Sequence, residues 1–266
     1  MDPCGALCSR QLELPIILSE GHPLLYELYK LYKPYEPDKL NTMKNLLLLL
    51  ALLIVGTAVA QVKRIKGTGY LLVQARDAKQ SFTKVSVQRG ITLYLKQGTE
   101  FGITIEADDN IISYVKTEIK NGQLNVFLDP NVIIRSFTAM NVSVAAPDIT
   151  DINVESAARL IGSSPLKVNK LDINASGAAV VKLEVEGKEL DVEASNAAKL
   201  ELKGAVDHLE LELSSAATLK AWDLRVTDCE AGVSGAAKAE VYVSGTLEVQ
   251  LSSAGLLVYD GNPRIT

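Results

Sequence analysis

Very few side chains in this sequence have the type and spacing that catalysis requires. His208, in the segment GAVDHLELEL, is the only histidine after residue 60, and no serine or cysteine near it completes a nucleophilic triad. Cys229 stands where neighbouring segments have a leucine, which favours a buried small hydrophobic residue over a reactive thiol. We therefore predict no catalytic residue and no enzymatic activity, with His208 solvated in a turn.

Carboxylates are the second group of side chains that could take part in catalysis or binding. One recurs in each of five successive segments, at Asp172, Asp191, Glu210, Glu230 and Glu248, and further acids stand at Asp108, Asp109, Asp148 and Asp151. Polysaccharide-cleaving enzymes use clustered acids, sometimes with Ca²⁺, but no Asp-x-Asp-x-Asp-Gly loop is present, so neither a metal site nor a cofactor is predicted. A solvated face, balanced in part by Lys170, Lys188 and Arg225, is the favoured interpretation, and cation binding by the row stays open.

Two aromatic residues suit carbohydrate binding. Trp222 is the only tryptophan, and its alternation with Ala221 predicts that it points outward. Tyr242, between Val241 and Val243, is placed in the same way. An exposed Trp near an exposed Tyr is a candidate carbohydrate-binding surface.

Composition excludes one large class of partner. The chain has 266 residues, a formal net charge of −5 and a pI of about 5.2. It has no basic stripe that would neutralise a phosphate backbone, so nucleic acid is not predicted as a partner.

The first sixty residues differ from the rest. Met43-Lys44-Asn45, the aliphatic run 46–55 and small residues at Ala58 and Ala60 predict a signal peptide over 43–60, cleaved after Ala60. A transmembrane anchor is the weaker alternative, because a spanning helix needs ~20 apolar residues. Residues 1–42, with the segment YELYKLYKPY, are interpreted as an over-extended start that is not part of the fold, with translation truly beginning at Met43. The mature protein is expected to have no membrane anchor and to be exported: periplasmic, outer-membrane-associated or extracellular.

A short motif of small residues recurs through the second half of the chain. Copies resembling Ser-x-Ala-Ala begin 18 to 21 residues apart, at Glu155, Ser176, Ser195, Ser214, Ser234 and Ser252. A fixed period of this length indicates stacked structural units. The motif predicts that each unit turns at its small residues, namely Ser156, Ser176, Gly177, Ser195, Ser214, Ser234, Gly235 and Ser252.

Between the corners, apolar and polar residues alternate strictly. From Leu171 to Val185 the apolar residues fall on odd numbers, and in the next unit they fall on even numbers. This period of two predicts strands with one buried face, and a second bend is expected near Gly187, Gly204 and Gly245. The fold class predicted is all-β, a single-stranded parallel β-helix of two short strands per coil. A leucine-rich repeat and an antiparallel sandwich fit the spacing less well.

Residues 62–145 alternate with less regularity and contain larger side chains. The pair Asn121-Gly122 predicts a tight hairpin turn. Because the end of a solenoid needs covering, we expect this part to form irregular or capping coils. One domain is therefore predicted over 61–266, with the regular repeats at 146–266.

The chain resembles the head GIN domain family ("putative auto-transporter adhesin") of Gram-negative envelope proteins. The resemblance covers about residues 82–266 and rests on FTKVSVQRGITLYLKQG, MNVSVAAPDITDINVESAARL, the serial corners and the closing SSAGLLVYDGNPRIT. It implies a right-handed β-helix of the pectin-lyase shape, exported, without established catalytic residues and associated with cell adhesion. Alanines replace a second small polar residue of the family at Ala179, Ala198, Ala217 and Ala237.

These observations favour one function and leave two alternatives. The favoured function is an exported, non-enzymatic β-solenoid that binds glycans or cell-envelope components in adhesion. A β-helix enzyme acting on acidic polysaccharide is the first alternative. The second is a structural envelope component that forms homo-oligomers.

Overall fold

The structure, a computed structural model, describes residues 62–266, and residues Gln61–Thr266 form one compact unit. The expectations for residues 1–42 and for the signal peptide at 43–60 lie outside the described residues. Every described element is a strand except one short 3-10 helix, Ile112–Tyr114.

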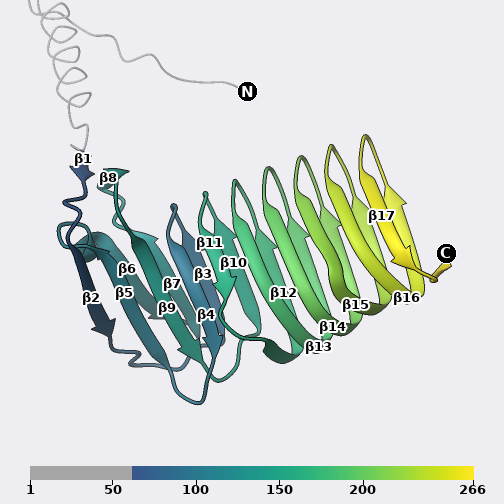
Figure 1. Cartoon of the computed structure of the whole chain (residues 1–266), viewed down its shortest axis with the longest axis horizontal. Helices are drawn as coiled ribbons and strands as arrows, with labels where there is room; N and C mark the ends of the chain where they lie inside the picture. The colour runs from purple at the N-terminus through teal and green to yellow at the C-terminus, as the bar shows by residue number, and fades with distance from the viewer. Residues whose placement is uncertain (1–61) are drawn as a thin grey trace, which may run out of the picture. The chain divides into compact units, whose positions relative to one another are not determined.

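Parallel coils stacked side by side make up most of this unit, in about six turns (Figure 1). The regular coils are formed by β12 (Leu166–Ala175), β13 (Val180–Ala194), β14 (Lys199–Leu213), β15 (Thr218–Val233) and β16 (Lys238–Leu251). Each of these strands pairs in parallel with the next along its length. The predicted all-β solenoid of parallel coils is confirmed.

One detail of the coil differs from the expectation of two short strands. The chain bends near Gly187 and Gly204 but stays hydrogen-bonded, so that each regular coil is a single bent strand of 14 to 16 residues from β13 onward. Gly204 has φ +114°, and a Cβ there would lie 2.1 Å from the carbonyl oxygen of Val185. A residue without a side chain therefore lets the strand bend without leaving the ladder.

The coils reverse at the predicted small-residue corners. The second residue of each β-turn has positive φ, between 54° and 71°, at Ser156, Gly177, Asn196, Ser215, Gly235 and Ser253. The fourth residue is almost completely buried, at Ala158, Ala179, Ala198, Ala217 and Ala237. The serines named by the motif are half-buried or exposed. Packing therefore restricts the size of the last alanine, and backbone geometry restricts the residue two positions before it.

A seventh corner precedes those found in the sequence. β3 (Lys84–Gln88) and β4 (Thr92–Gln97) pair with β10 (Asp151–Glu155) and β11 (Arg159–Gly162), so the first coil stacks on the regular ones. Its turn places Arg89 and Gly90 at φ 62° and 73° and buries Ile91. The solenoid thus begins well before residue 146.

The amino-terminal end is covered by antiparallel strands. β2 (Leu71–Arg76) pairs with β5 (Gly102–Asp108), which pairs with β9 (Met140–Ala146). β6 (Val115–Lys120) and β7 (Gln123–Leu128) form the predicted hairpin, with Asn121 and Gly122 at φ 52° and 74°. β1 (Lys63–Lys66) and β8 (Val132–Ser136) form a separate parallel pair, and β17 (Leu256–Gly261) and β18 (Arg264–Ile265) are the last strands at the other end.

The core is the inward row of each coil. The odd-numbered apolar residues from Leu171 to Val185 and the even-numbered ones from Leu190 to Leu202 are buried as predicted, glycine corners aside. Cys229 is 2% exposed and lies in the ladder between Leu209 and Leu247. Burial raises the pKa of this thiol to about 12, so it stays protonated and acts as a core residue.

Candidate functional site

Carboxylates cover one outer face of the coils. This acidic face comprises the outward side chains of β10 and of the later halves of β12 to β16, namely Asp151, Asp172, Asp191, Glu193, Glu210, Glu212, Glu230 and Glu248. The ladders place Asp172 opposite Asp191, Asp191 opposite Glu210, Glu210 opposite Glu230, and Glu230 opposite Glu248. The row expected from the sequence therefore does stack.

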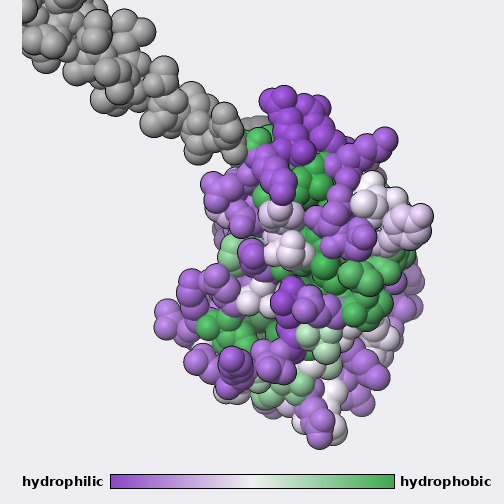
Figure 2. Space-filling model, turned by 90° about the vertical axis from the view of Figure 1, so that its left-hand side faces the viewer, coloured by the Kyte–Doolittle hydropathy of each residue, from purple (hydrophilic) through white to green (hydrophobic). Residues whose placement is uncertain are grey.

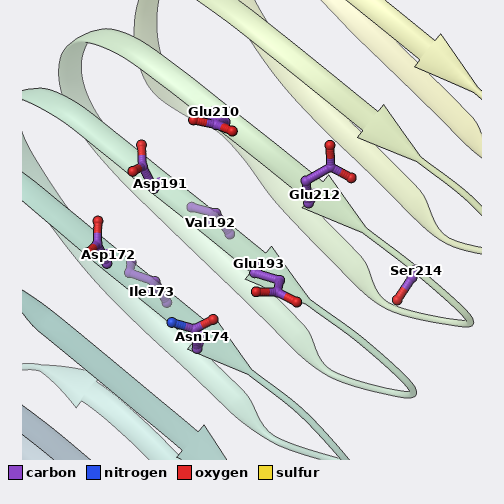
Figure 3. A pocket seen from close by; sticks show the side chains of 9 residues that line it. All are labelled: Asp172, Ile173, Asn174, Asp191, Val192, Glu193, Glu210, Glu212 and Ser214. Carbon is purple, nitrogen blue, oxygen red and sulfur yellow. The ribbon is translucent and has the colours of Figure 1, made fainter.

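An open groove of about 520 Å³ runs along this face and is lined by Asp172, Asp191, Glu193, Glu210 and Glu212, among others. Figure 3 shows Asp172, Asp191 and Glu210 standing on successive strands. No group of three or more His, Cys, Asp or Glu residues within 62–266 is arranged to hold a metal ion. The groove is thus lined mainly by negatively charged side chains.

Lys170 neutralises one end of the acidic face. Its Nζ lies 2.6 Å from a carboxylate oxygen of Glu189 and 2.6 Å from one of Asp191, and these two partners raise the pKa of Lys170. The pKa of Asp172 is raised, chiefly by burial and further by Asp191 and Asp151, although Lys170 opposes the shift. The acids toward the carboxyl end, Glu210, Glu230 and Glu248, have no ion-pair partner among the described residues. Of the expected balancing cations, Lys170 acts here, whereas Arg225 lies against Tyr242.

The opposite outer face has more basic than acidic residues, and they alternate with other residues in two ladder rows. This lysine face comprises the outward side chains of β11 and of the earlier halves of β13 to β16, with Arg159, Lys182, Lys199, Lys220 and Lys238 beside Glu201 and Glu240. A groove of about 390 Å³ is lined by Lys182, Lys199, Lys220 and Glu201, among others. Lys182 is paired with Glu201 at 2.6 Å, whereas Lys199 and Lys220 have no ion-pair partner among residues 62–266.

The two predicted aromatic residues lie on this lysine face. Three residues of β15, Trp222 to Leu224, stand between Ala221, which pairs with Val241, and Arg225, which pairs with Tyr242. The extra residues form a bulge, a feature that redirects side chains. Trp222 is 37% exposed, while the guanidinium of Arg225 lies 4.0 Å from the centre of the half-buried Tyr242 ring. The free aromatic surface is therefore that of Trp222, and its use in carbohydrate binding stays a prediction.

His208 does not lie in a turn. It is half-buried within β14, opposite Glu189 and Asp228 in the ladders, because the strand continues through the bend. Its ladder neighbours are acids and not nucleophiles. The expectation of a solvated turn residue is therefore corrected.

Asp108 and Asp109, adjacent in sequence, have different roles. Asp108 is fully buried and accepts hydrogen bonds from the backbone N–H groups of Gly69 and Thr138, at 2.7 and 2.8 Å. Burial alone would raise the pKa of Asp108, but these backbone donors outweigh it and the pKa is lowered. Asp109 is exposed and accepts from the hydroxyl of Thr68. Asp108 is thus a structural anchor of the amino-terminal end.

Comparison with known families and structures gives a consistent result. A family model described as "Putative auto-transporter adhesin, head GIN domain" matches residues 81–263. No curated protein matches significantly. Within residues 62–266, no helix has the length and apolar character needed to cross a bilayer.

Several solved structures of bacterial proteins share the fold. A protein from Bacteroides fragilis described as a putative adhesin has a TM-score of 0.71 at 20% identity, over 76% of this chain and 93% of that one. A putative adhesin from Parabacteroides merdae has a TM-score of 0.64 at 21% identity, over 77% and 94%. A protein from Parabacteroides distasonis described as a putative lipid binding protein has a TM-score of 0.59 at 19% identity, over 77% and 95%. Identities this low establish the common fold alone.

Proposed function

Because the chain belongs to the head GIN domain family of putative auto-transporter adhesins, we propose that it is an exported, non-enzymatic adhesion protein that binds envelope glycans. The lysine face is the binding surface in this proposal. Export is supported by the residues at 43–60, which have the order of a signal peptide. Protein isolated from its native cell should then begin at Gln61.

The observation that carries the proposal is the presence on one face of Lys199 and Lys220, which form no salt bridge within residues 62–266, together with the exposed ring of Trp222. Lys220 stands in register between Glu201 and Glu240. Lys199 and Lys220 line a groove, and Trp222 follows two residues after Lys220 on the same strand. Lysines attract the acidic groups of an anionic glycan, and an exposed indole stacks on a sugar ring. The opposite face repels such a polymer, so binding is expected on the lysine face alone.

The test is binding of residues 61–266 to an array of envelope glycans, followed by titration of the strongest ligand. The double variant Lys199→Gln/Lys220→Gln and the single variant Trp222→Ala should each weaken binding about tenfold or more, which corresponds to about 1.4 kcal/mol. The matched control is Glu210→Gln/Glu230→Gln on the acidic face, which should leave the affinity unchanged or slightly increase it. Binding that is insensitive to both lysine-face variants would contradict the proposed surface.

The enzymatic alternative has a separate test. A polysaccharide lyase or hydrolase would generate unsaturated products or new reducing ends from uronate-containing glycans. We expect neither after prolonged incubation, because the carboxylates beside these lysines, Glu201 and Glu240, are each paired with a lysine that lowers their pKa and makes them weak bases. Product formation that survives further purification would overturn the non-enzymatic assignment.

A further inference from the structure

The last strand of the solenoid departs from the pattern of the coils before it. On the lysine face, Leu256 is in register with Lys238, and Val258 is in register with Glu240. The two coils before these have Thr218 and Lys220, and Lys199 and Glu201, in the same two rows. Three successive coils with polar or charged residues are thus followed by two apolar residues, so that both sides of β17 are apolar from Leu256 to Tyr259.

The inward rows also end without a cover. Leu251, Tyr259 and Ile265 continue the rows of Val233, Val241 and Leu247, which are 1% exposed or less, but they are themselves 44–55% exposed. Among the described residues β17 and β18 each pair with β16 alone, so each leaves one backbone edge unpaired. The exposed surface at this end therefore has the apolar composition of the contact between two coils inside the solenoid, but no next coil covers it.

The other end of the same sheet has a similar edge. Among residues 62–266, β2 pairs with β5 alone, and Leu71, Leu72 and Val73 are 43–68% exposed. Figure 2 faces this end and shows hydrophobic surface among hydrophilic side chains. Edge strands in water are usually protected by charge, and β6, an edge strand that pairs with β7 alone, has Lys116, Glu118 and Lys120. From Leu71 to Ala75, β2 has no charge.

Strand direction makes these two edges compatible. β2 is antiparallel to β5, which is antiparallel to β9, and β9 is parallel to β4. From β4 the pairing stays parallel through β11 and β13 to β17. Therefore β2 and β17 run in the same direction, and a second copy placed end to end presents β2 to β17 in the parallel sense that every regular coil interface already has.

We infer that copies of this chain associate end to end, with β17 of one copy pairing with β2 of the next. The partner is a second copy because the exposed rows continue the coil-to-coil interface and because the complementary uncharged edge belongs to the same sheet. The two surfaces differ, so the contact is heterologous, and each added copy leaves the same pair of ends free. The association therefore yields dimers at low concentration and short filaments at higher concentration.

Two end-blocked variants test this geometry in residues 61–266, the compact unit with its own core. The first, Leu256→Lys/Val258→Glu, restores the charges that the preceding coil has at Lys238 and Glu240. The second, Leu72→Glu/Val73→Lys, places charge on β2. Sedimentation velocity should show concentration-dependent association of the unmodified chain and a monomer for each variant alone. An equimolar mixture of the two variants should form a dimer and nothing larger, because only one compatible pair of ends remains.

Each other outcome contradicts the inference. An unmodified chain that stays monomeric at all concentrations excludes association, and a mixture that stays monomeric excludes pairing of β17 with β2. Self-association of the β2 variant alone would instead indicate a two-fold contact through β17.

Hydrogen exchange on the unmodified chain provides a measurement without substitutions: amides of β2 and β17 should exchange roughly tenfold more slowly at high concentration, while those of β6 should not change. Equal exchange in all three strands would also contradict the inference.

Discussion

The buried alanine at the end of each corner is the residue on which close stacking of the corners depends most directly. Ala198 and Ala217 are 0% exposed, and the amide of the residue after Ala217, Thr218, donates to the carbonyl of Ala198 at 2.9 Å. The corner backbones are thus bonded from coil to coil around these methyl groups. A larger side chain has no space unless the ladder separates.

Enlarging one corner alanine should therefore destabilise the fold. We expect Ala217→Leu to lower the free energy of unfolding by about 1–3 kcal/mol, the usual range for overpacking. Urea unfolding monitored by circular dichroism measures the change. The matched control is Ala216→Leu, one position earlier, where the side chain is exposed. Equal costs at the two positions would contradict the packing argument.

The ionised carboxylate of Asp172 should lower the stability of the fold at neutral pH. Its pKa is raised, chiefly by burial, and one of its carboxylate oxygens has no hydrogen-bond partner. Because the folded-state pKa lies above the unfolded value, the charged form opposes folding at pH 7, and this penalty fades as the pH falls toward the unfolded value of about 3.9. The side chain is 39% exposed, so screening keeps the effect small.

The variant Asp172→Asn tests this sign. We expect it to raise the free energy of unfolding by about 0.5 kcal/mol at pH 7 and to lose most of that advantage by pH 4.5. Thermal unfolding across this pH range measures the difference. Asp148→Asn, at an exposed residue outside the ladders, is the control and should give no such trend. A variant that is less stable than the unmodified chain at pH 7 would show that the attraction of Lys170 dominates.

The corners require a particular backbone conformation in addition to small side chains. The second position of every corner has positive φ, which glycine adopts freely and other L-residues adopt at a cost of about 1–2 kcal/mol. Gly177 and Gly235 meet this requirement, whereas Asn196 and Ser215 occupy the same position with side chains. The corners are therefore unequal in strain although they look alike in sequence.

Glycine at a strained corner should stabilise its turn. Ser215 has φ +60°, and we expect Ser215→Gly to raise the free energy of unfolding by about 0.5–1 kcal/mol, since relief of strain exceeds the added entropy of the unfolded chain. Ala216→Gly, in the same corner at a residue without positive φ, should instead be destabilising by a similar amount. Chemical denaturation of both proteins decides the matter, and a loss at both positions would argue against strain at Ser215.

The coil could be predicted from sequence because its constraints are local and periodic. Alternation of period two identified the inward rows, and the small-residue motif identified six corners. The corner at Gln88–Ile91 was missed because its residues, Gln-Arg-Gly-Ile, have the same positive φ at the second position but do not match the Ser-x-Ala-Ala motif. The uninterrupted strand through each bend was also missed, since glycine in a sequence does not reveal whether the ladder breaks or bends there.

The candidate site was only partly predictable, and the reason is the register between coils. The acidic row was found because one acid recurs per period, and the ladders keep that spacing. The lysine face depends on which residues lie side by side across β14, β15 and β16. Register shifts at Ala221/Arg225 and Val226/Asp228 break the regular spacing there. The neighbours of Trp222, including the Arg225–Tyr242 contact, therefore follow from three-dimensional pairing and not from position in the repeat.

Across residues 62–266 the solenoid concentrates acids on one outer face and mixes lysines with acids on the other, and this arrangement has an energetic consequence. Adjacent rungs of a parallel ladder are ~4.8 Å apart, and two unit charges at that distance in water repel by about 0.9 kcal/mol before screening. Glu230 has such a neighbour on each side, Glu210 and Glu248, and no cation partner among the described residues. On the lysine face, by contrast, Lys182 and Glu201 on adjacent coils attract each other.

Neutralising an acid should therefore have opposite effects on the two faces. We expect Glu230→Gln to raise the free energy of unfolding by about 0.5–1 kcal/mol at 20 mM salt and by almost nothing at 500 mM, where screening acts within a few ångströms. Glu201→Gln is the matched control: it removes the partner of Lys182, so it should be neutral or destabilising at low salt. Denaturant unfolding measures the change in the free energy of unfolding for each of the two variants at each of the two salt concentrations. If both variants gained stability at low salt, the excess of negative charge over the whole molecule, and not its concentration on one face, would be the cause.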